Sequence, residues 1–333
     1  MAVTMRDVAA RAGVSIATVS FVVNESKPVK EPTRLRIEQA MAELGFQRNM
    51  VARALASRQT RIIALAYPAL DHRLGWSIVD FVTSAAQAAA DAGYHLVLWP
   101  VSNDATELAE LVGQGLVDGV LLMHVQLDDA RVEVLRPMDI PFALIGRTRD
   151  VEGLAYVDID FDASLRVAVD HLSGLGHREI VLVTGTQETQ NFREYGPYVR
   201  LEAAFGQVTG GPVLRCRQDP GSGRELATRL AVEAPTATAV IVADEAISAG
   251  LVAGLHTRGT RIPTDMSVLC ILTSRDMAAM CDPPLTIVTA PGVELGRLGV
   301  EALLCRVQGA TPPPPELRAG ELLPGESTGP APA

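Results

Sequence analysis

The sequence contains few cysteines, and their placement gives no sign of a metal site or a disulfide framework. Two cysteines separated by two residues are the usual signature of structural zinc or thiol redox chemistry, and no such pair occurs. Secreted domains that depend on disulfides carry a denser set. We therefore expect no metal, no cofactor, and reduced thiols at Cys216, Cys270, Cys281 and Cys305.

Long apolar runs and common enzyme motifs are missing too. No run approaches the ~20 apolar residues of a membrane helix, and the first residues include neither a charged leader nor an apolar stretch long enough for export. The chain has no P-loop, no complete G-x-G-x-x-G turn, no G-x-S-x-G elbow and no H-E-x-x-H helix. These absences predict a cytoplasmic protein that is not an enzyme, rather than a membrane protein or an exported binding protein.

Charge is distributed unevenly along the chain. The segment 1–60 carries nine Lys or Arg against five acidic side chains, whereas the whole chain has a net charge of −10, which leaves −14 for the segment 61–333. A basic segment joined to an acidic body is typical of a protein that binds nucleic acid through one part only. We expect the acidic part to have a different partner.

The basic segment begins with the pattern of a helix-turn-helix. Thr4 is placed to cap a first helix that begins at Met5, and Asp7 occupies the second position of a capping box. Gly13 ends this helix. Ser15 can then cap the second helix.

The second helix has two distinct sides. Its apolar side faces a shared small core through Val19, Val22 and Val23, and its other side stays more exposed. A third helix is expected after Pro32, with its end at Gly45. The three helices predict a small all-α domain that places the amino-terminal residues of the second helix at base edges in the DNA major groove.

From Arg61 onward, short apolar runs alternate with helical stretches. Runs that are apolar throughout are typical of parallel strands covered on both faces. Because the alternation occurs in two rounds, we predict two doubly wound lobes, with a ligand crevice at the carboxyl ends of the strands or between the lobes. The expected strands are 62–67, 96–99, 119–123, 142–145, 180–184, 239–243 and 268–272, and the expected helices are 78–91, 107–114, 163–175, 224–233 and 247–258.

Seven short segments occur in an order that is similar to one known family. They are residues 4–24, 43–46 and 49–55 in the basic segment, followed by 170–180, 262–268, 283–288 and 294–296. Together they resemble the LacI/GalR family of bacterial transcription regulators. The resemblance implies an α/β fold of two doubly wound parallel-sheet lobes, like those of a periplasmic binding protein, preceded by a small all-α helix-turn-helix domain.

The resemblance also implies where the parts of the chain begin and end. Residues 1–45 would form the DNA-binding domain, 46–60 a hinge helix or linker, and 61–333 the core that binds effector and dimerises. The lobes of this family exchange strands, so the amino-terminal lobe would take approximately 61–158 and 288–318, and the carboxy-terminal lobe 159–287 and 319–333. The Pro-rich tail has no leucine heptad, which argues against an added tetramerisation helix.

The DNA contacts implied by the resemblance fall on the second helix and the hinge. Leu55 takes the position of a leucine inserted into the minor groove, where an apolar side chain can kink the duplex. The family usually has an arginine or another polar residue at Phe21 and a proline at Arg48, so we expect a different preferred operator. The expected DNA-binding residues are Thr4, Ser15, Ile16, Ala17, Thr18, Ser20, Phe21, Asn24, Arg48, Asn49, Arg53 and Leu55.

Most candidate effector contacts are charged or aromatic residues near strand ends, and one, Thr273, carries a hydroxyl. A polyol is held by charged planar groups that make two hydrogen bonds and by an aromatic face that stacks on its ring. The resemblance assigns ligand hydroxyls to Asp244 and Arg200, and we expect Arg200 just before a helix. The full set is Tyr67, Asp71, Arg73, Trp76, Arg147, Asp158, Arg200, Asp244 and Thr273.

The candidate effector site departs from the family in two places. The family has an acidic run where this chain has Leu269 to Ser274, and an Asn-Pro-Phe-Phe-like stretch where this chain has Arg73 to Trp76. Two interpretations remain open. Either the effector carries fewer hydroxyls than a typical hexose, or the cleft has lost control by a ligand.

These features predict a sequence-specific DNA-binding transcriptional regulator that acts as a repressor. It would bind a palindromic operator as a homodimer, each head on one half-site. A small effector, sugar-like by resemblance, would shift the lobes and so stabilise or melt the hinge helices. The alternative is a small-molecule binding or sensing protein with a vestigial DNA-binding head.

Overall fold

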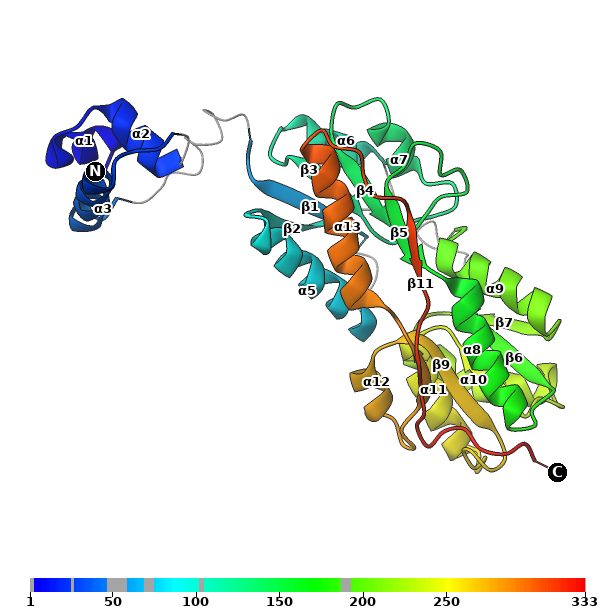
Figure 1. The fold of residues 1–333 in the computed structure, drawn as a ribbon. Helices are drawn as coiled ribbons and strands as arrows, with labels where there is room; N and C mark the ends of the chain where they lie inside the picture. Colours follow the sequence, from blue (N-terminus) through cyan, green and yellow to red (C-terminus); the bar gives the residue numbers. More distant parts are fainter. Residues whose placement is uncertain are drawn as a thin grey trace. The chain divides into compact units, whose positions relative to one another are not determined.

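The chain folds into two compact units, a small one up to Thr60 and a larger one from Arg61 onward (Figure 1). The computed structural model describes residues 3–24, 27–46, 59–68, 75–101, 105–186 and 193–332. Most of the predicted hinge, residues 47–58, lies outside this described part. Among the described residues, no helix combines the length and the apolar character needed to cross a bilayer.

The small unit contains the helices α1 (Met5–Ala12), α2 (Ile16–Asn24) and α3 (Glu31–Leu44). The capping box predicted for α1 is confirmed, because the Thr4 hydroxyl accepts a hydrogen bond from the Asp7 amide while the Asp7 carboxylate accepts one from the Thr4 amide. Gly13 ends α1 with a φ of +66°, a left-handed conformation that glycine adopts without steric cost. The Ser15 hydroxyl accepts from the Thr18 amide at 3.1 Å, as expected of a cap.

The third helix begins earlier than the sequence indicated. It starts at Glu31, so the expected start after Pro32 was wrong. Proline is tolerated in the first turn because the amide that it lacks would have no partner inside the helix. The helix ends at Gly45, as predicted. The core between the three helices consists of small and branched apolar side chains, Val8, Ala9, Ala12, Val19, Val23, Ile37 and Ala40, with Val22 packed against them at partial burial.

The larger unit contains two six-stranded sheets, one in each lobe. The sheet of the amino-terminal lobe has the order β11-β5-β4-β3-β1-β2, and all of its neighbours are parallel. Its strands are β1 (Ile62–Tyr67), β2 (His95–Pro100), β3 (Gly119–Leu122), β4 (Phe142–Ile145), β5 (Tyr156–Ile159) and β11 (Glu316–Arg318). Its helices are α5 (Trp76–Asp91), α6 (Ala105–Gly113), α7 (Ala130–Leu135) and α13 (Gly292–Val307).

The sheet of the carboxy-terminal lobe has the order β12-β10-β9-β8-β6-β7, and only the pair of β10 and β12 is antiparallel among its described strands. Its strands are β6 (Ile180–Gly185), β7 (Val213–Cys216), β8 (Ala239–Val242), β9 (Ser267–Thr273), β10 (Thr286–Thr289) and β12 (Leu322–Leu323). Its helices are α8 (Phe161–Gly174), α9 (Gly196–Val208), α10 (Pro220–Glu233), α11 (Glu245–Thr257) and α12 (Arg275–Ala279).

The chain passes between the two lobes three times. It leaves the amino-terminal sheet after β5, returns after β10 to form α13, and crosses again after β11. The orange helix α13 therefore packs beside the cyan helix α5, although the two lie far apart in the sequence (Figure 1). Strands β3, β4, β6 and β8 are buried at every position, which confirms that their apolar runs form parallel strands covered on both faces.

Candidate functional site

A cavity of about 870 Å³ lies between the two lobes and is lined by residues from both. Its walls include residues that follow the strands directly: Met123 to Val125 after β3, Gly146 and Arg147 after β4, and Ala243 to Glu245 after β8. Parallel α/β sheets bind ligands at this position, because the carboxyl ends of the strands and the loops after them meet there. The cavity is therefore the candidate effector site.

Four aromatic rings form a continuous part of the cavity wall. Tyr67 meets His124 edge-on with ring centroids 5.7 Å apart, His124 stacks on Tyr195 at 4.0 Å, and Tyr195 meets Tyr198 edge-on at 5.0 Å. Tyr67 and His124 belong to the amino-terminal lobe, whereas Tyr195 and Tyr198 belong to the carboxy-terminal lobe. The row of rings therefore joins the two lobes. Burial raises the pKa of all three tyrosine hydroxyls, so each stays protonated at neutral pH and can donate to a ligand.

Two arginines and an aspartate form a charged part of the wall. The Asp158 carboxylate on β5 is nearly completely buried, and its Oδ2 lies 3.1 Å from Nη1 of Arg147. Arg200, from the other lobe, donates from Nη2 to the carbonyl oxygens of Arg147 at 3.0 Å and Thr148 at 3.3 Å. Burial raises the pKa of Asp158 to about 6, although both arginines act to lower it.

Arg200 lies inside a helix rather than before one. Helix α9 begins at Gly196 and includes Pro197 in its first turn, so the expectation that Arg200 precedes a helix was wrong. Four residues of helix lead up to Arg200, and this places its guanidinium where it reaches carbonyl groups of the opposite lobe.

Asp244 caps a helix and lines the cavity at once. Its Oδ1 accepts from the amide of Ile247 at 2.9 Å, which caps α11, and the Tyr198 hydroxyl donates to its Oδ2 at 3.5 Å. Burial raises the pKa of Asp244 to about 6. A half-buried carboxylate beside a phenol is suited to accept hydrogen bonds from ligand hydroxyls.

The other expected effector residues divide into three groups. Trp76, the first residue of α5, lines the cavity with its side chain half exposed. Thr273 is fully buried and is not part of the lining; its hydroxyl donates to Oε1 of Glu245 at 2.9 Å. Asp71 and Arg73 lie outside the described residues. The structure thus brings Tyr67, Trp76, Arg147, Asp158, Arg200 and Asp244 together around one cavity.

Backbone conformation is unusual at the same place. His124 and Leu272, which line the cavity, have φ angles of 59° and 63°, and Glu194, next to Tyr195, has a φ of 50°. Side chains other than glycine rarely adopt this left-handed conformation, and such residues cluster at ligand sites. Leu272 occupies the point where the pairing of β9 with β10 shifts register, so a bulge directs it to the cavity.

Sequence reasoning missed much of this wall, including the aromatic and charged residues His124, Tyr195, Tyr198 and Glu245. Glu245 had a usable signal, because it forms a tandem carboxylate pair with Asp244 directly after an apolar strand. The three rings had none. His124 is distant in sequence from the two tyrosines, and the rings meet only after the lobes have folded.

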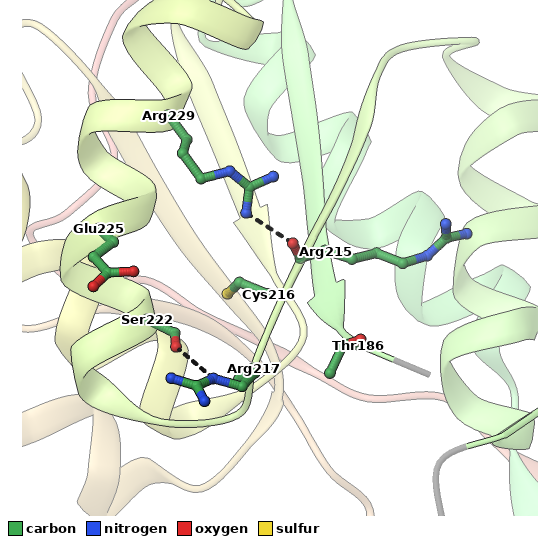
Figure 2. A pocket seen from close by; sticks show the side chains of 7 residues that line it. All are labelled: Thr186, Arg215, Cys216, Arg217, Ser222, Glu225 and Arg229. Carbon is green, nitrogen blue, oxygen red and sulfur yellow. Dashed lines mark hydrogen bonds between the residues drawn. The ribbon is translucent and has the colours of Figure 1, made fainter. Parts of the chain in front are cut away.

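A second cavity of about 670 Å³ lies on the carboxy-terminal lobe beside β7 and α10, and Figure 2 shows its lining. Arg229 donates to the carbonyl of Arg215, and Arg217 donates to the Ser222 hydroxyl (Figure 2). The Arg215 side chain extends away from the other labelled groups and pairs with Glu202 on α9. None of the predicted effector residues that the structure describes lines this cavity.

The small unit presents the beginning of α2 to its surface. Ser15, Ile16 and Ala17 are exposed, and Thr18, Ser20 and Phe21 are half-buried. The Lys27 ammonium lies 5.1 Å from the centre of the Phe21 ring. Thr4 is exposed at the start of α1, and Asn24 is the last residue of α2. Arg48, Asn49, Arg53 and Leu55 lie outside the described residues.

Comparison with known proteins relates both units to one group. Residues 4–49 match the family model of bacterial regulatory proteins of the lacI family, and residues 169–328 match that of the periplasmic binding protein-like domain. The transcriptional regulator CelR of Thermobifida fusca is 31% identical over 330 residues, which cover 94% of each chain.

Solved structures extend the similarity to the whole chain. The lac repressor dimer bound to operator and the anti-inducer ONPF superimposes with a TM-score of 0.84 at 25% identity, covering 99% of this chain and 100% of that one. A CelR–cellobiose complex superimposes with a TM-score of 0.69 at 28% identity, covering 98% and 99%. The chain therefore belongs to the lacI family of bacterial DNA-binding transcriptional regulators.

Proposed function

We propose that this regulator is a cytoplasmic repressor that binds a palindromic operator as a homodimer and is controlled by a sugar-like effector in the cavity between its lobes. The observation that carries the proposal is the pairing of a basic helix-turn-helix, whose second helix exposes its amino-terminal residues, with a ligand-sized cavity in the acidic core. A two-fold symmetric dimer reads two half-sites related by the same axis.

The division of labour along the chain follows from the same proposal. Residues 1–45 read the major groove, 46–60 form the hinge, and 61–333 bind effector and dimerise, with lobes of approximately 61–158 with 288–318 and 159–287 with 319–333. Residues 4, 15–18, 20, 21 and 24 contact DNA from the head, and 48, 49, 53 and 55 contact it from the hinge. Enzymatic activity has no place in this mechanism.

The effector is a small polar ring compound held by the cavity wall. Lac repressor and CelR are solved with ligands that their names give as ONPF and cellobiose. In this chain Arg147, Asp158, Arg200 and Asp244 supply the charged groups that hold hydroxyls, and the tyrosines and Trp76 supply apolar faces. An effector regulates DNA binding only if its affinity differs between the lobe arrangements.

DNA binding is tested by gel-shift titration of the full chain on upstream DNA over a series of salt concentrations. We expect a sequence-selective complex whose affinity falls steeply with salt, because basic side chains displace counterions from phosphates. A chain that shows no preference for any duplex over random competitor would instead be a ligand-sensing protein with a vestigial head.

Two substitutions test how DNA is read. Leu55→Ala should weaken selective binding and leave nonspecific binding almost unchanged, because the leucine side chain inserts into the minor groove only where the operator's base step opens. Phe21→Arg should change the preferred bases, since a guanidinium pairs with guanine through two hydrogen bonds. Equal loss of both binding modes for the first variant, or an unchanged site profile for the second, would contradict these roles.

The effector site is tested by Asp244→Asn, which keeps the helix cap but removes the charge. Thermal-shift screening of sugars, nucleosides and small acids against the protein first identifies a ligand. We expect the variant to bind it at least tenfold more weakly, because hydrogen bonds to a charged group contribute roughly 1.5–3 kcal/mol. Asp160→Asn is the matched control, since Asp160 caps α8 in the same way and does not line the cavity. Equal ligand affinity in both variants would exclude Asp244.

A further inference from the structure

Glu245 is the first residue of α11 in the carboxy-terminal lobe, yet its carboxylate binds the other lobe. Oε2 accepts from the amide of Trp76 at 2.6 Å, and Oε1 accepts from the amide of Ser77 at 3.0 Å. These amides belong to the first two residues of α5. One side chain therefore satisfies two donors at the start of a helix that lies 168 residues earlier in the sequence.

Helix α5 has no cap of its own. Gly75 stands at its N-cap position and has no side chain, whereas α7, α8, α10, α11 and α12 are each capped by a side chain directly before them. The first amides of a helix lack partners inside it and carry a partial positive charge. A carboxylate supplied by the opposite lobe therefore takes the place of the missing local cap.

The surroundings fix this carboxylate in position. The Thr273 hydroxyl donates to Oε1 at 2.9 Å, and the Ser274 amide lies 3.4 Å from the same oxygen. Four donors from two lobes thus converge on one group. Glycine at position 75 leaves the space that the carboxylate needs, since a Cβ there would lie 2.8 Å from Oε2.

We propose that Glu245 is an interlobe clasp, which caps α5 from across the effector cavity and so couples lobe closure to the position of Trp76. The proposal rests on the proposed function of the cavity and names a regulatory contact within it. The Trp76 amide donates to the Glu245 carboxylate, and both residues line the cavity. Separation of the lobes breaks both hydrogen bonds and leaves the start of α5 to water.

The clasp shifts the balance between lobe arrangements without any ligand. Loss of a helix cap changes an equilibrium by roughly tenfold, which corresponds to about 1.4 kcal/mol. The apparent affinity of an effector that binds only the clasped arrangement is proportional to the fraction of molecules already in that arrangement. The clasp raises this fraction and therefore the apparent affinity. Thr273, expected as a direct effector contact, is then a positioning residue that acts through Glu245.

The test is amide hydrogen exchange at Trp76 and Ser77 in the full chain without effector. In Glu245→Ala we expect exchange at these two amides to be about tenfold faster, with α11 unchanged. Gly75→Ala should act in the same direction from the opposite lobe, because its methyl group displaces the carboxylate. Thr273→Val, which leaves Glu245 in place, should give a smaller increase. Glu301→Ala is the control, since it removes an exposed glutamate that pairs with Arg297 on α13.

A second readout follows Trp76 directly. With Trp99 replaced by Phe, acrylamide quenching of the remaining tryptophan should increase when Glu245→Ala is added. The double variant of Gly75→Ala and Glu245→Ala should show the same exchange and quenching as the stronger single variant, because both substitutions break the same contact.

Unchanged exchange at Trp76 and Ser77 in Glu245→Ala would overturn the clasp, and so would additive effects in the double variant. Faster exchange throughout the core would also overturn it, because Glu245 would then only support folding. These readouts need neither DNA nor effector. A failure of the clasp is thereby distinguished from a failure of the proposed function, which shows in the gel shift of the wild-type chain.

Discussion

Gly250→Ala tests the contact between two helices that support the effector cavity. Helices α10 and α11 pack so closely that a Cβ at Gly250 would lie 2.2 Å from the carbonyl oxygen of Pro220. Gly223 and Gly254 approach the opposite backbone in the same way. Pro220 and Asp219 line the cavity at the start of α10, so any separation of these helices also changes the cavity wall.

The magnitude follows from two opposing effects. Alanine is a better helix former than glycine by up to about 1 kcal/mol, whereas forcing a methyl group into a packed interface costs about 1–3 kcal/mol. The blocking atoms are backbone and cannot rotate away, so the second effect should win. We expect a net loss of about 1–2 kcal/mol, which lowers the melting temperature by roughly 2–6 °C in a domain of this size.

The assay is thermal unfolding followed by circular dichroism, with Gly206→Ala as the matched control. Gly206 also lies within a helix, but a Cβ there would meet no atom within 4 Å. The control should therefore gain up to about 1 kcal/mol from helix propensity alone. If Gly250→Ala melts at or above the wild-type temperature, close packing does not explain the glycine.

Three further predictions concern ionisable side chains whose surroundings shift their pKa or pair their charge. Burial raises the pKa of Asp158 and Asp244 to about 6, above the unfolded value near 4. The stability that these two groups contribute is therefore fully present below about pH 4 and is lost as pH rises through 6. Asp158→Asn should make the free energy of unfolding less dependent on pH between about 4 and 6. Asp129→Ala should cost roughly 3–5 kcal/mol in chemical denaturation, because it leaves Arg131 buried without its partner, and a loss under about 1 kcal/mol would contradict this. Burial lowers the pKa of His177 below 6.5, so its contribution to stability is lost as pH falls, and a ring titration by NMR with a midpoint at or above 6.5 would disprove it.

Much of the fold could be predicted because it depends on local pattern. The run Ile62 to Tyr67 is β1 and Phe142 to Ile145 is β4, residue for residue, since an apolar run without a turn residue specifies a strand buried on both faces. The caps at Thr4 and Ser15 depend on residues three positions apart. Helix starts were placed up to four residues late, as at Pro220 in α10, because polar and glycine residues of the first turn do not contribute to the apolar period.

Some of the elements that were missed depend on distant partners for their stability. Strand β11 has only three residues and pairs with β5, a strand that lies far earlier in the sequence. The tail beyond it was assigned to the carboxy-terminal lobe by resemblance, but its contacts were not predicted. Ser327 is completely buried; its hydroxyl donates to the Val268 carbonyl and accepts from the Thr286 amide, and its carbonyl accepts from the Val268 amide. Proline prevents helix but allows an extended segment, and composition does not reveal what that segment lies against.

Within the candidate site, the sequence predicted several residues that lie at the cavity but not which groups they contact. Arg147 and Asp158 were expected at the cavity from their position at strand ends, and Asp244 from its position and from the family resemblance. What each charge binds could not be deduced. Asp158 and Arg200 belong to different lobes, and the Arg200 guanidinium reaches backbone carbonyls rather than a carboxylate.

Strand β1 places a limit on how an effector could act on the head. It begins two residues after Thr60, ends at Tyr67 in the cavity wall, and is buried at every position after its first. Parallel neighbours hold it on both sides, β2 at all six residues and β3 at four. A strand paired in this way cannot slide by a fraction of a residue without losing its whole ladder. An effector that displaces the backbone of β1 must therefore also displace the strands paired with it, which favours regulation by movement of the amino-terminal lobe as one body.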